Sequence, residues 1–198
     1  MIDLRLVLFL ALAGCSEAPE NAAPAPTVEV VTANTAPASA PVIAPARQSA
    51  FSDVDMGLCR TIEESKDEGP YWLGRCTGYA GWQFEWSESD LRQDLTLIDK
   101  RGRKTELGLS GWVAQGAFNT LNGGKIEWRG DDLVSPDTLI VRMNVARNEE
   151  PQRPDISRLA VVRLTPKPCV IAVVEPAADQ NAKARAIADG TLRECLTS

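Results

Sequence analysis

The sequence contains no histidine, and this absence excludes several kinds of functional site. Ser-His-Asp and Cys-His catalysis, histidine-bearing zinc sites and imidazole pH switches all need a ring that gains or loses a proton near neutrality. Basic residues are also few, because 21 lysines and arginines stand against 27 aspartates and glutamates, for a net charge of −6. Nucleic-acid binders usually carry a basic excess. We therefore expect no nucleic acid among the partners, and no motif indicates a metal or a cofactor.

Long hydrophobic runs are absent as well. The longest apolar stretch, Leu6 to Ala13, would form a helix of about 12 Å, whereas the hydrocarbon core of a membrane is ~30 Å thick. The stretch is too short to span a membrane, but it has the length of the apolar region of a signal peptide.

The residues Leu12-Ala13-Gly14-Cys15 close this stretch and resemble the lipobox of bacterial lipoproteins. The resemblance implies that residues 1–14 are removed as a signal peptide and that Cys15 carries a diacylglyceryl thioether and an N-acyl group. Ser16 resembles the residue found in lipoproteins of the outer membrane, rather than the aspartate that retains others at the inner membrane. We expect a lipid-anchored protein at the periplasmic face of the outer membrane, and an ordinary signal peptide is the alternative.

Residues 17–50 hold eleven alanines and six prolines, with no aromatic residue and no glycine. Such a segment buries too little apolar surface to offset the entropy lost on ordering. We predict a lipidated N-terminus and a disordered tether over residues 15–50. A chain of 198 residues that is 44% hydrophobic has room for one ordinary domain besides these appendages, which we place at 51–198.

Four cysteines remain in this domain once Cys15 is assigned to lipid: Cys59, Cys76, Cys169 and Cys195. An even number of cysteines in an exported chain indicates disulfide bonds. Three pairings are open. We favour Cys59–Cys76 and Cys169–Cys195, because the first pair encloses a short segment and the second would join the terminal helix to a neighbouring strand.

The domain has the pattern of an α+β fold, mainly an antiparallel sheet with one C-terminal helix. Residues 82–86 alternate aromatic and polar side chains, which puts Trp82, Phe84 and Trp86 on one strand face, where we expect them in the core. The alanine-rich segment 177–194 predicts a helix whose apolar stripe Cys195 continues, and Gly190 interrupts or ends it. Further strands are predicted at 95–98, 125–129, 138–146, 158–164 and 169–174, and short connections favour an antiparallel meander for the last three.

Four features of the domain together resemble an uncharacterised family of exported proteobacterial proteins. They are the segments 76–79, 117–119 and 124–129, and a terminal helix that ends near a cysteine. The resemblance covers most of residues 51–198 and implies no activity.

Three aromatic residues, Tyr71, Trp72 and Tyr79, are candidates for a binding surface. They lie near Cys76 in the sequence, and an exposed tyrosine or tryptophan offers a flat apolar face with a polar edge. The ligand expected for such a surface is an envelope protein or a glycan.

Two groups of charged residues invite alternative interpretations. Glycoside hydrolases use two carboxylates about 5–9 Å apart, so Glu85, Glu88 and Asp90 are candidates for an envelope hydrolase acting on glycan. The simpler interpretation is that these three residues and Asp94 form a solvated turn. The basic run Lys100–Lys104 would suit an anionic surface such as lipid headgroups, or it forms a solvated hairpin tip. We predict a non-catalytic binding or structural module facing the periplasm, with the hydrolase as the alternative.

Overall fold

The computed structural model describes residues 47–197, except 68, 122, 148–151 and 192–193. The predicted signal peptide, Cys15 and nearly all of the predicted tether lie outside these residues. The described residues belong to one compact unit, Ile43–Ser198. Within the described part, no helix has the length and apolar character needed to cross a bilayer.

The first of two antiparallel sheets is a meander in which every strand pairs with the next one along the chain. Its order is β2 (Arg60–Ser65), β3 (Tyr71–Thr77), β4 (Gln83–Ser89), β5 (Arg92–Ile98) and β6 (Lys104–Glu106). The 3-10 turn η1 (Met56–Leu58) precedes this sheet, and the short helix α1 (Leu109–Trp112) follows it.

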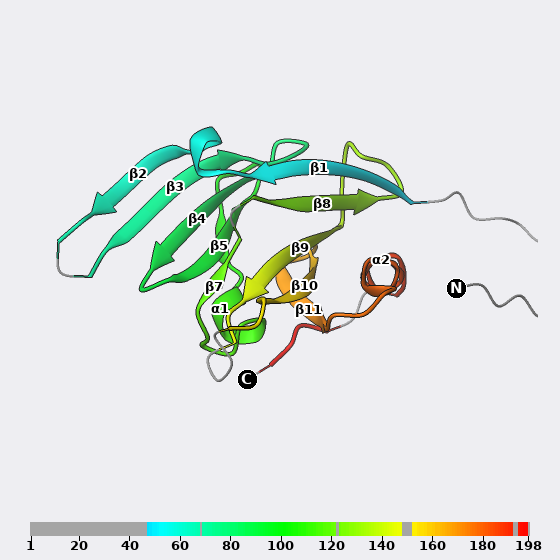
Figure 1. Cartoon of the computed structure of the whole chain (residues 1–198). Helices are drawn as coiled ribbons and strands as arrows, with labels where there is room; N and C mark the ends of the chain where they lie inside the picture. The colour runs from blue at the N-terminus through cyan, green and yellow to red at the C-terminus, as the bar shows by residue number, and fades with distance from the viewer. Residues whose placement is uncertain (1–46, 68, 122, 148–151, 192–193, 198) are drawn as a thin grey trace, which may run out of the picture. The chain divides into compact units, whose positions relative to one another are not determined.

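The second sheet contains the predicted meander of the C-terminal half, with strands at nearly the predicted positions. Its order is β1 (Gln48–Val54), β8 (Gly124–Gly130), β9 (Thr138–Val145), β10 (Ile156–Arg163) and β11 (Cys169–Val174), with β7 (Asn119–Thr120) also beside β9. The whole first sheet is therefore inserted between β1 and its partner β8 (Figure 1). Strand β1 begins at Gln48, within the segment assigned above to the tether.

The main core lies between the two sheets, because alternate residues of each strand face it. From the first sheet, Phe84 and Trp86 of β4 are fully buried, as predicted, and from the second sheet Ile126 and Trp128 of β8 are fully buried. Trp82 precedes β4 and is only partly buried, but it packs against this core.

The helix α2 (Gln180–Asp189) covers the other face of the second sheet (Figure 1). Ala184 and Ala188 of α2 pack with Leu159 and Val161 of β10, whereas the intervening β10 residues face the main core. The fold is thus α+β and mainly antiparallel sheet, with one C-terminal helix beyond the single turn of α1. The prediction of helix to residue 194 was too long, because the chain leaves the helix at Gly190 and Cys195 lies outside it.

Both predicted disulfides are present, Cys59–Cys76 and Cys169–Cys195. The second joins β11 to the segment that follows α2. In this segment, the backbone N–H of Leu196 donates to the carbonyl of Val170, 2.9 Å away, so the segment also occupies part of the β11 edge.

A network of charged side chains lies between α2 and the sheet. Arg129, which is 5% exposed, donates to both carboxylate oxygens of Asp189 on α2, at 2.8 and 2.5 Å. It also donates to Glu127 at 2.7 Å. Glu127 accepts further hydrogen bonds from Ser49 of β1, at 2.6 Å, and from Arg185 of α2, at 2.9 Å. The network joins the first strand of the domain to its last helix.

Candidate functional site

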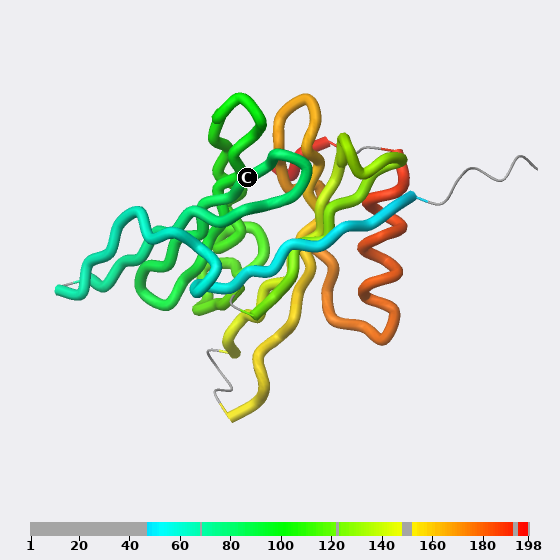
Figure 2. Tube along the Cα trace, turned by 90° about the horizontal axis from the view of Figure 1, so that it is seen from above, coloured from blue at the N-terminus to red at the C-terminus, as the bar shows by residue number. Residues whose placement is uncertain are grey.

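The first sheet has two ends, each formed by two hairpin turns. The β2–β3 and β4–β5 turns lie at one end, and the β3–β4 and β5–β6 turns lie at the other. The β2–β3 hairpin projects beyond β1, so the second sheet does not cover the inner face of its tip (Figures 1 and 2). Four of the six residues proposed from the sequence lie at this end of the sheet.

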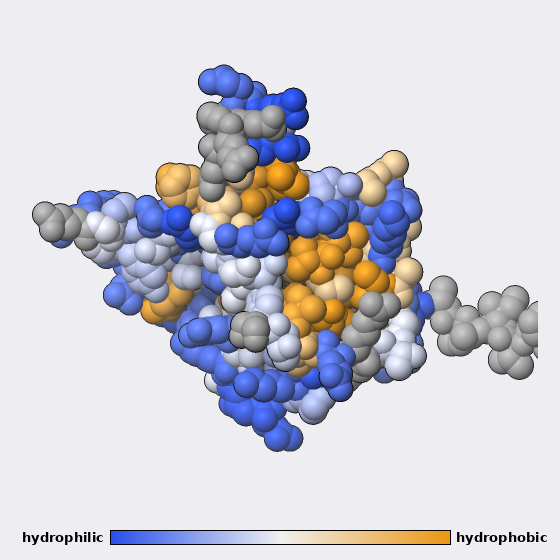
Figure 3. Space-filling view, turned by 90° about the horizontal axis from the view of Figure 1, so that it is seen from below, coloured by the Kyte–Doolittle hydropathy of each residue, from blue (hydrophilic) through white to orange (hydrophobic). Residues whose placement is uncertain are grey.

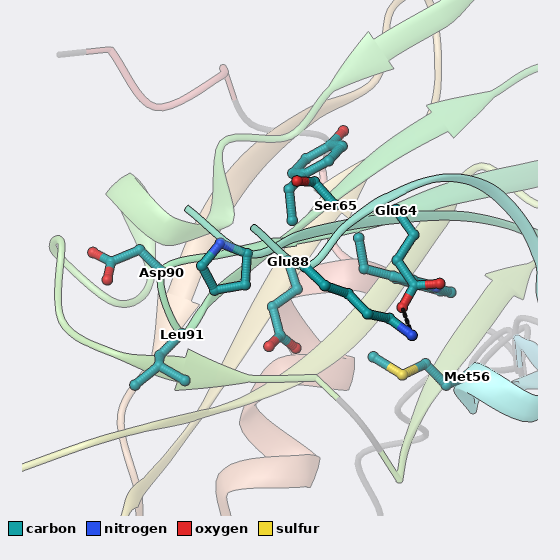
Figure 4. A pocket seen from close by; sticks show the side chains of 10 residues that line it. Met56, Glu64, Ser65, Glu88, Asp90 and Leu91 are labelled. Carbon is teal, nitrogen blue, oxygen red and sulfur yellow. Dashed lines mark ion pairs between the residues drawn. The ribbon is translucent and has the colours of Figure 1, made fainter. Parts of the chain in front are cut away.

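We call the cavity at this tip the acidic pocket; its volume is about 310 Å³ (Figure 4). Its lining combines apolar and aromatic side chains with three carboxylates and a single lysine: Met56, Glu64, Ser65, Lys66, Pro70, Tyr71, Trp72, Glu88, Asp90 and Leu91. A concave apolar surface with a few convergent polar groups is the usual form of a binding site.

Strand register explains why two of the carboxylates flank one tryptophan. Glu64 of β2 pairs with Trp72 of β3, which pairs in turn with Glu88 of β4, so the three side chains form a row on one face of the sheet. Neighbouring strands lie about 4.8 Å apart, so the two glutamates start from backbones about 10 Å apart. The pocket therefore places a carboxylate on either side of an aromatic ring.

Contacts with neighbouring strands hold the Trp72 indole in place. Its ring meets the fully buried Trp86 edge-to-face, with 5.2 Å between the ring centroids, and its Nε1–H donates to the Thr61 hydroxyl at 3.3 Å. Gly74 makes room for this ring, because a Cβ at Gly74 would lie 2.2 Å from an indole carbon. Trp72 is partly buried rather than exposed as predicted, since its indole is also part of the core surface.

Each carboxylate of the pocket already has a partner. Gln93, a buried residue of β5, donates from Nε2 to Glu88 at 2.5 Å. Glu64 lies 3.2 Å from the ammonium of Lys66, and Asp90 pairs with Arg92. In Figure 4, Asp90 points away from Glu88, toward the outside of the pocket.

The rim of the pocket includes a leucine in a backbone conformation that leucine disfavours. Asp90 and Leu91 form the two-residue β4–β5 turn, with φ of 50° and 58°. The left-handed region costs an L-residue roughly 1–2 kcal/mol, and asparagine or glycine is preferred in such turns. The backbone N–H of Asn119 donates to the Leu91 carbonyl at 3.0 Å and helps to hold the turn. The Leu91 side chain is nevertheless 61% exposed.

The structure brings together four of the six residues proposed from the sequence for binding or catalysis: Tyr71, Trp72, Glu88 and Asp90. Tyr79 does not join them. It lies in the β3–β4 turn at the opposite end of the sheet, where its side chain is partly buried against the core. Sequence reasoning missed Met56, Glu64 and Leu91, which carry no recognisable motif.

Glu85 is also separate from the pocket, and it is not solvated as expected for a turn carboxylate. It is 5% exposed on the opposite face of the sheet, 2.5 Å from Arg75 and 2.7 Å from Lys104. Burial acts to raise the pKa of Glu85, but hydrogen bonds from Lys104 and Arg75 outweigh it and hold the pKa below its ordinary value. Glu85 is therefore a structural ion-pair partner.

Another cavity, of about 530 Å³, lies between β11 and α2, where Figure 3 shows apolar residues gathered beside the helix. Val173 and Ile187 are among its lining residues. Its charged lining residues are Glu175 and Lys183, fewer than the three carboxylates and one lysine of the acidic pocket, which is therefore the stronger candidate. Among the described residues, no group of three or more histidine, cysteine, aspartate or glutamate side chains is arranged to hold a metal ion.

Comparisons with protein-family models, with curated proteins and with solved structures find no match to this chain.

Proposed function

We propose that the chain is an exported, lipid-anchored binding protein of the cell envelope, and that its acidic pocket holds a segment of a partner protein. The observation that carries this proposal is Leu91. An exposed leucine kept in a left-handed turn contributes little to folding and costs backbone strain, and such strain concentrates at functional positions. At the pocket rim, Leu91 adds apolar contact area for a ligand.

The chemistry of the lining indicates what this segment carries. Trp72, Met56 and Leu91 offer apolar contact area, which a leucine or aromatic side chain of the partner would cover. Glu64 and Glu88 lie on either side of Trp72 and would attract basic side chains, one of which would replace the exposed Lys66 beside Glu64. The expected ligand is an extended segment with one large apolar residue between two lysines or arginines about 10 Å apart.

The pocket is a better docking point than the open edge of β2 beside it. A register shift between Thr61 and Glu63 bulges this edge strand. All of its residues are exposed, and Arg60, Glu63 and Glu64 place charges along it. Bulges and charges on an edge strand oppose the addition of a further strand, so we expect side-chain recognition in the pocket.

The alternative, an envelope hydrolase that cleaves glycan with carboxylates, retains Glu88 and Asp90 but loses Glu85. Hydrolysis of a glycosidic bond needs two carboxyl groups on opposite sides of that bond, one of them a proton donor. Asp90 points away from Glu88, and Glu88 accepts a hydrogen bond from Gln93. The arrangement favours binding over this chemistry.

Leu91→Gly separates the binding role from folding. Glycine relieves the left-handed strain, so the free energy of unfolding is expected to rise by about 1 kcal/mol. Loss of the side chain is expected to weaken binding of a fluorescent decapeptide by about tenfold, as for a rim contact that completes a hot spot. The peptide carries a central Phe and a lysine two residues to either side, so that the three side chains share one face of an extended chain. Fluorescence anisotropy and urea denaturation measure the two effects.

Two comparisons make this test decisive. Phe51→Ala removes another exposed apolar side chain, from β1 and away from the pocket, and should leave peptide affinity unchanged. Unchanged peptide affinity in Leu91→Gly would refute the pocket as the binding site. Binding of an N-acetylglucosamine oligomer, with no binding of the peptide, would refute a protein segment as the ligand.

The anchor rests on the lipobox resemblance of Leu12-Ala13-Gly14-Cys15, supported by the two disulfides, which suit an oxidising compartment. Replacing Cys15 by serine removes the sulfur that would take the thioether. In cell fractionation, we expect this variant to accumulate as an unprocessed or soluble form. Unchanged processing and membrane association would exclude lipidation at Cys15.

A further inference from the structure

A second polar cavity, of about 300 Å³, lies at the opposite end of the first sheet; we call it the cationic pocket. Its lining comes from the β3–β4 and β5–β6 turns and from two loops of the second sheet: Trp82, Asp99, Lys100, Arg101, Arg103, Ser135, Pro136, Leu164, Thr165, Pro166 and Pro168. We infer that this pocket binds the phosphate group of an organic phosphate ester. This inference is independent of the peptide ligand proposed for the acidic pocket.

Two of the three cations are held in position. The Lys100 stem lies against Gly81, with its carbons 3.2 to 3.5 Å from where a Cβ would stand, and its ammonium donates to the Val134 carbonyl at 3.3 Å. Arg103 donates from Nε to Asp99 at 2.6 Å. Each group keeps further N–H donors, and ordering the cations before binding reduces the entropy lost when an anion is bound.

The carboxylate in the lining does not neutralise the pocket. Asp99 accepts hydrogen bonds from the backbone N–H groups of Arg101 and Arg103, at 2.8 and 2.9 Å, besides the bond from the Arg103 side chain. These hydrogen bonds, chiefly that from the Arg103 backbone, lower the pKa of Asp99. Asp99 therefore stabilises the hairpin tip through these hydrogen bonds. The lining of the pocket holds three cationic side chains and one carboxylate, although the protein has a net charge of −6.

The remaining walls suit the organic part of an ester. Trp82 and three prolines form an apolar surface. The hydroxyls of Ser135 and Thr165 add donors for phosphate oxygens. Phosphate oxygens would thus meet the cations and hydroxyls while carbon atoms meet Trp82 and the prolines.

The pocket also sharpens the interpretation of the basic run Lys100–Lys104. Lys104 is not available to a ligand in this arrangement, because its ammonium pairs with the buried Glu85 at 2.7 Å. Arg101 is exposed and its side chain makes no hydrogen bond or ion pair with the described residues, so it is the cation with most capacity left. Phosphate esters occur as diesters in lipid headgroups and as monoesters in soluble metabolites, and both present anionic phosphate oxygens to these residues.

The test uses the full chain with Cys15→Ser, so that no acyl group can contribute to membrane binding. The probes are sn-glycerol 3-phosphate, followed by the NMR shift of the Trp82 indole N–H, and flotation with vesicles of phosphatidylcholine with or without phosphatidylglycerol. Lys100→Gln/Arg101→Gln is expected to weaken binding by about tenfold or more, since two charge-assisted contacts are lost. Lys125→Gln/Lys183→Gln makes the same change of charge at two exposed ion pairs elsewhere and should leave binding unchanged.

The two arms distinguish the sources of phosphate. A loss confined to glycerol phosphate in the pocket variant supports a soluble ester, and a loss that extends to phosphatidylglycerol vesicles supports a headgroup. Equal behaviour of the two double variants with both probes would overturn the inference, as would the absence of a Trp82 shift together with equal flotation.

Discussion

Arg129→Leu is expected to lower the free energy of unfolding by about 4 kcal/mol, because removing one partner of a buried ionic network leaves the others uncompensated. The affected partners are Glu127, in the sheet, and Asp189, on α2. Urea denaturation followed by tryptophan fluorescence measures the loss. Arg185→Leu removes a half-exposed partner of the same glutamate and should cost under about 1 kcal/mol. Equal losses in the two variants would contradict the central role of Arg129.

Low pH should remove the stability that the same charged network contributes. Burial acts to raise the pKa of Glu127, but hydrogen bonds from Arg185, Ser49 and Arg129 lower it below the ordinary value of 4.5. A carboxyl whose pKa is lower in the folded state stabilises the fold above its unfolded pKa, and this contribution is lost as the pH falls through the folded pKa. The free energy of unfolding should therefore fall below about pH 4.5, and by less in Arg129→Leu.

Removing the Cys169–Cys195 disulfide by a double alanine substitution is expected to cost about 3 kcal/mol, from the loop of 26 residues that it closes in the unfolded chain. The loss also frees the segment whose Leu196 donates to β11. Thermal unfolding under non-reducing conditions measures the effect. Removing Cys59–Cys76, with a loop of 17, should cost a similar amount, within about 0.5 kcal/mol. A variant as stable as the parent would show that the bridge constrains nothing.

Strands that bury one face were predictable from the sequence. β9, β10 and β11 show β-branched runs, and the alternation in β4 correctly placed Phe84 and Trp86 in the core. β2 could not be predicted, because all six of its residues are exposed and it is a strand only through its pairing with β3. β1 begins in an alanine- and proline-rich composition and is likewise defined by a distant partner, β8.

The candidate site was predictable only in part, for a related reason. Trp72 and Glu88 meet through cross-strand register, which no spacing along the chain reveals. Glu85 and Glu88 were grouped by proximity in sequence, yet they lie three residues apart on one strand, so they point to opposite faces. Leu91 lies at the pocket because of the left-handed turn, and a leucine in the sequence does not predict such a turn.

The insertion of one sheet between β1 and β8 sets the order in which this domain can assemble. The hairpins of β2 to β6 pair residues that are close in the sequence. In contrast, Gln48 of β1 pairs with Gly130 of β8, and Val54 pairs with Gly124. Pairings between distant segments form slowly, because the entropy of closing the long loop is lost before the stabilising contacts form. Strand β1 therefore has the partner most distant in sequence among the described strands, and until the two pair its edge is open to proteases and to other chains.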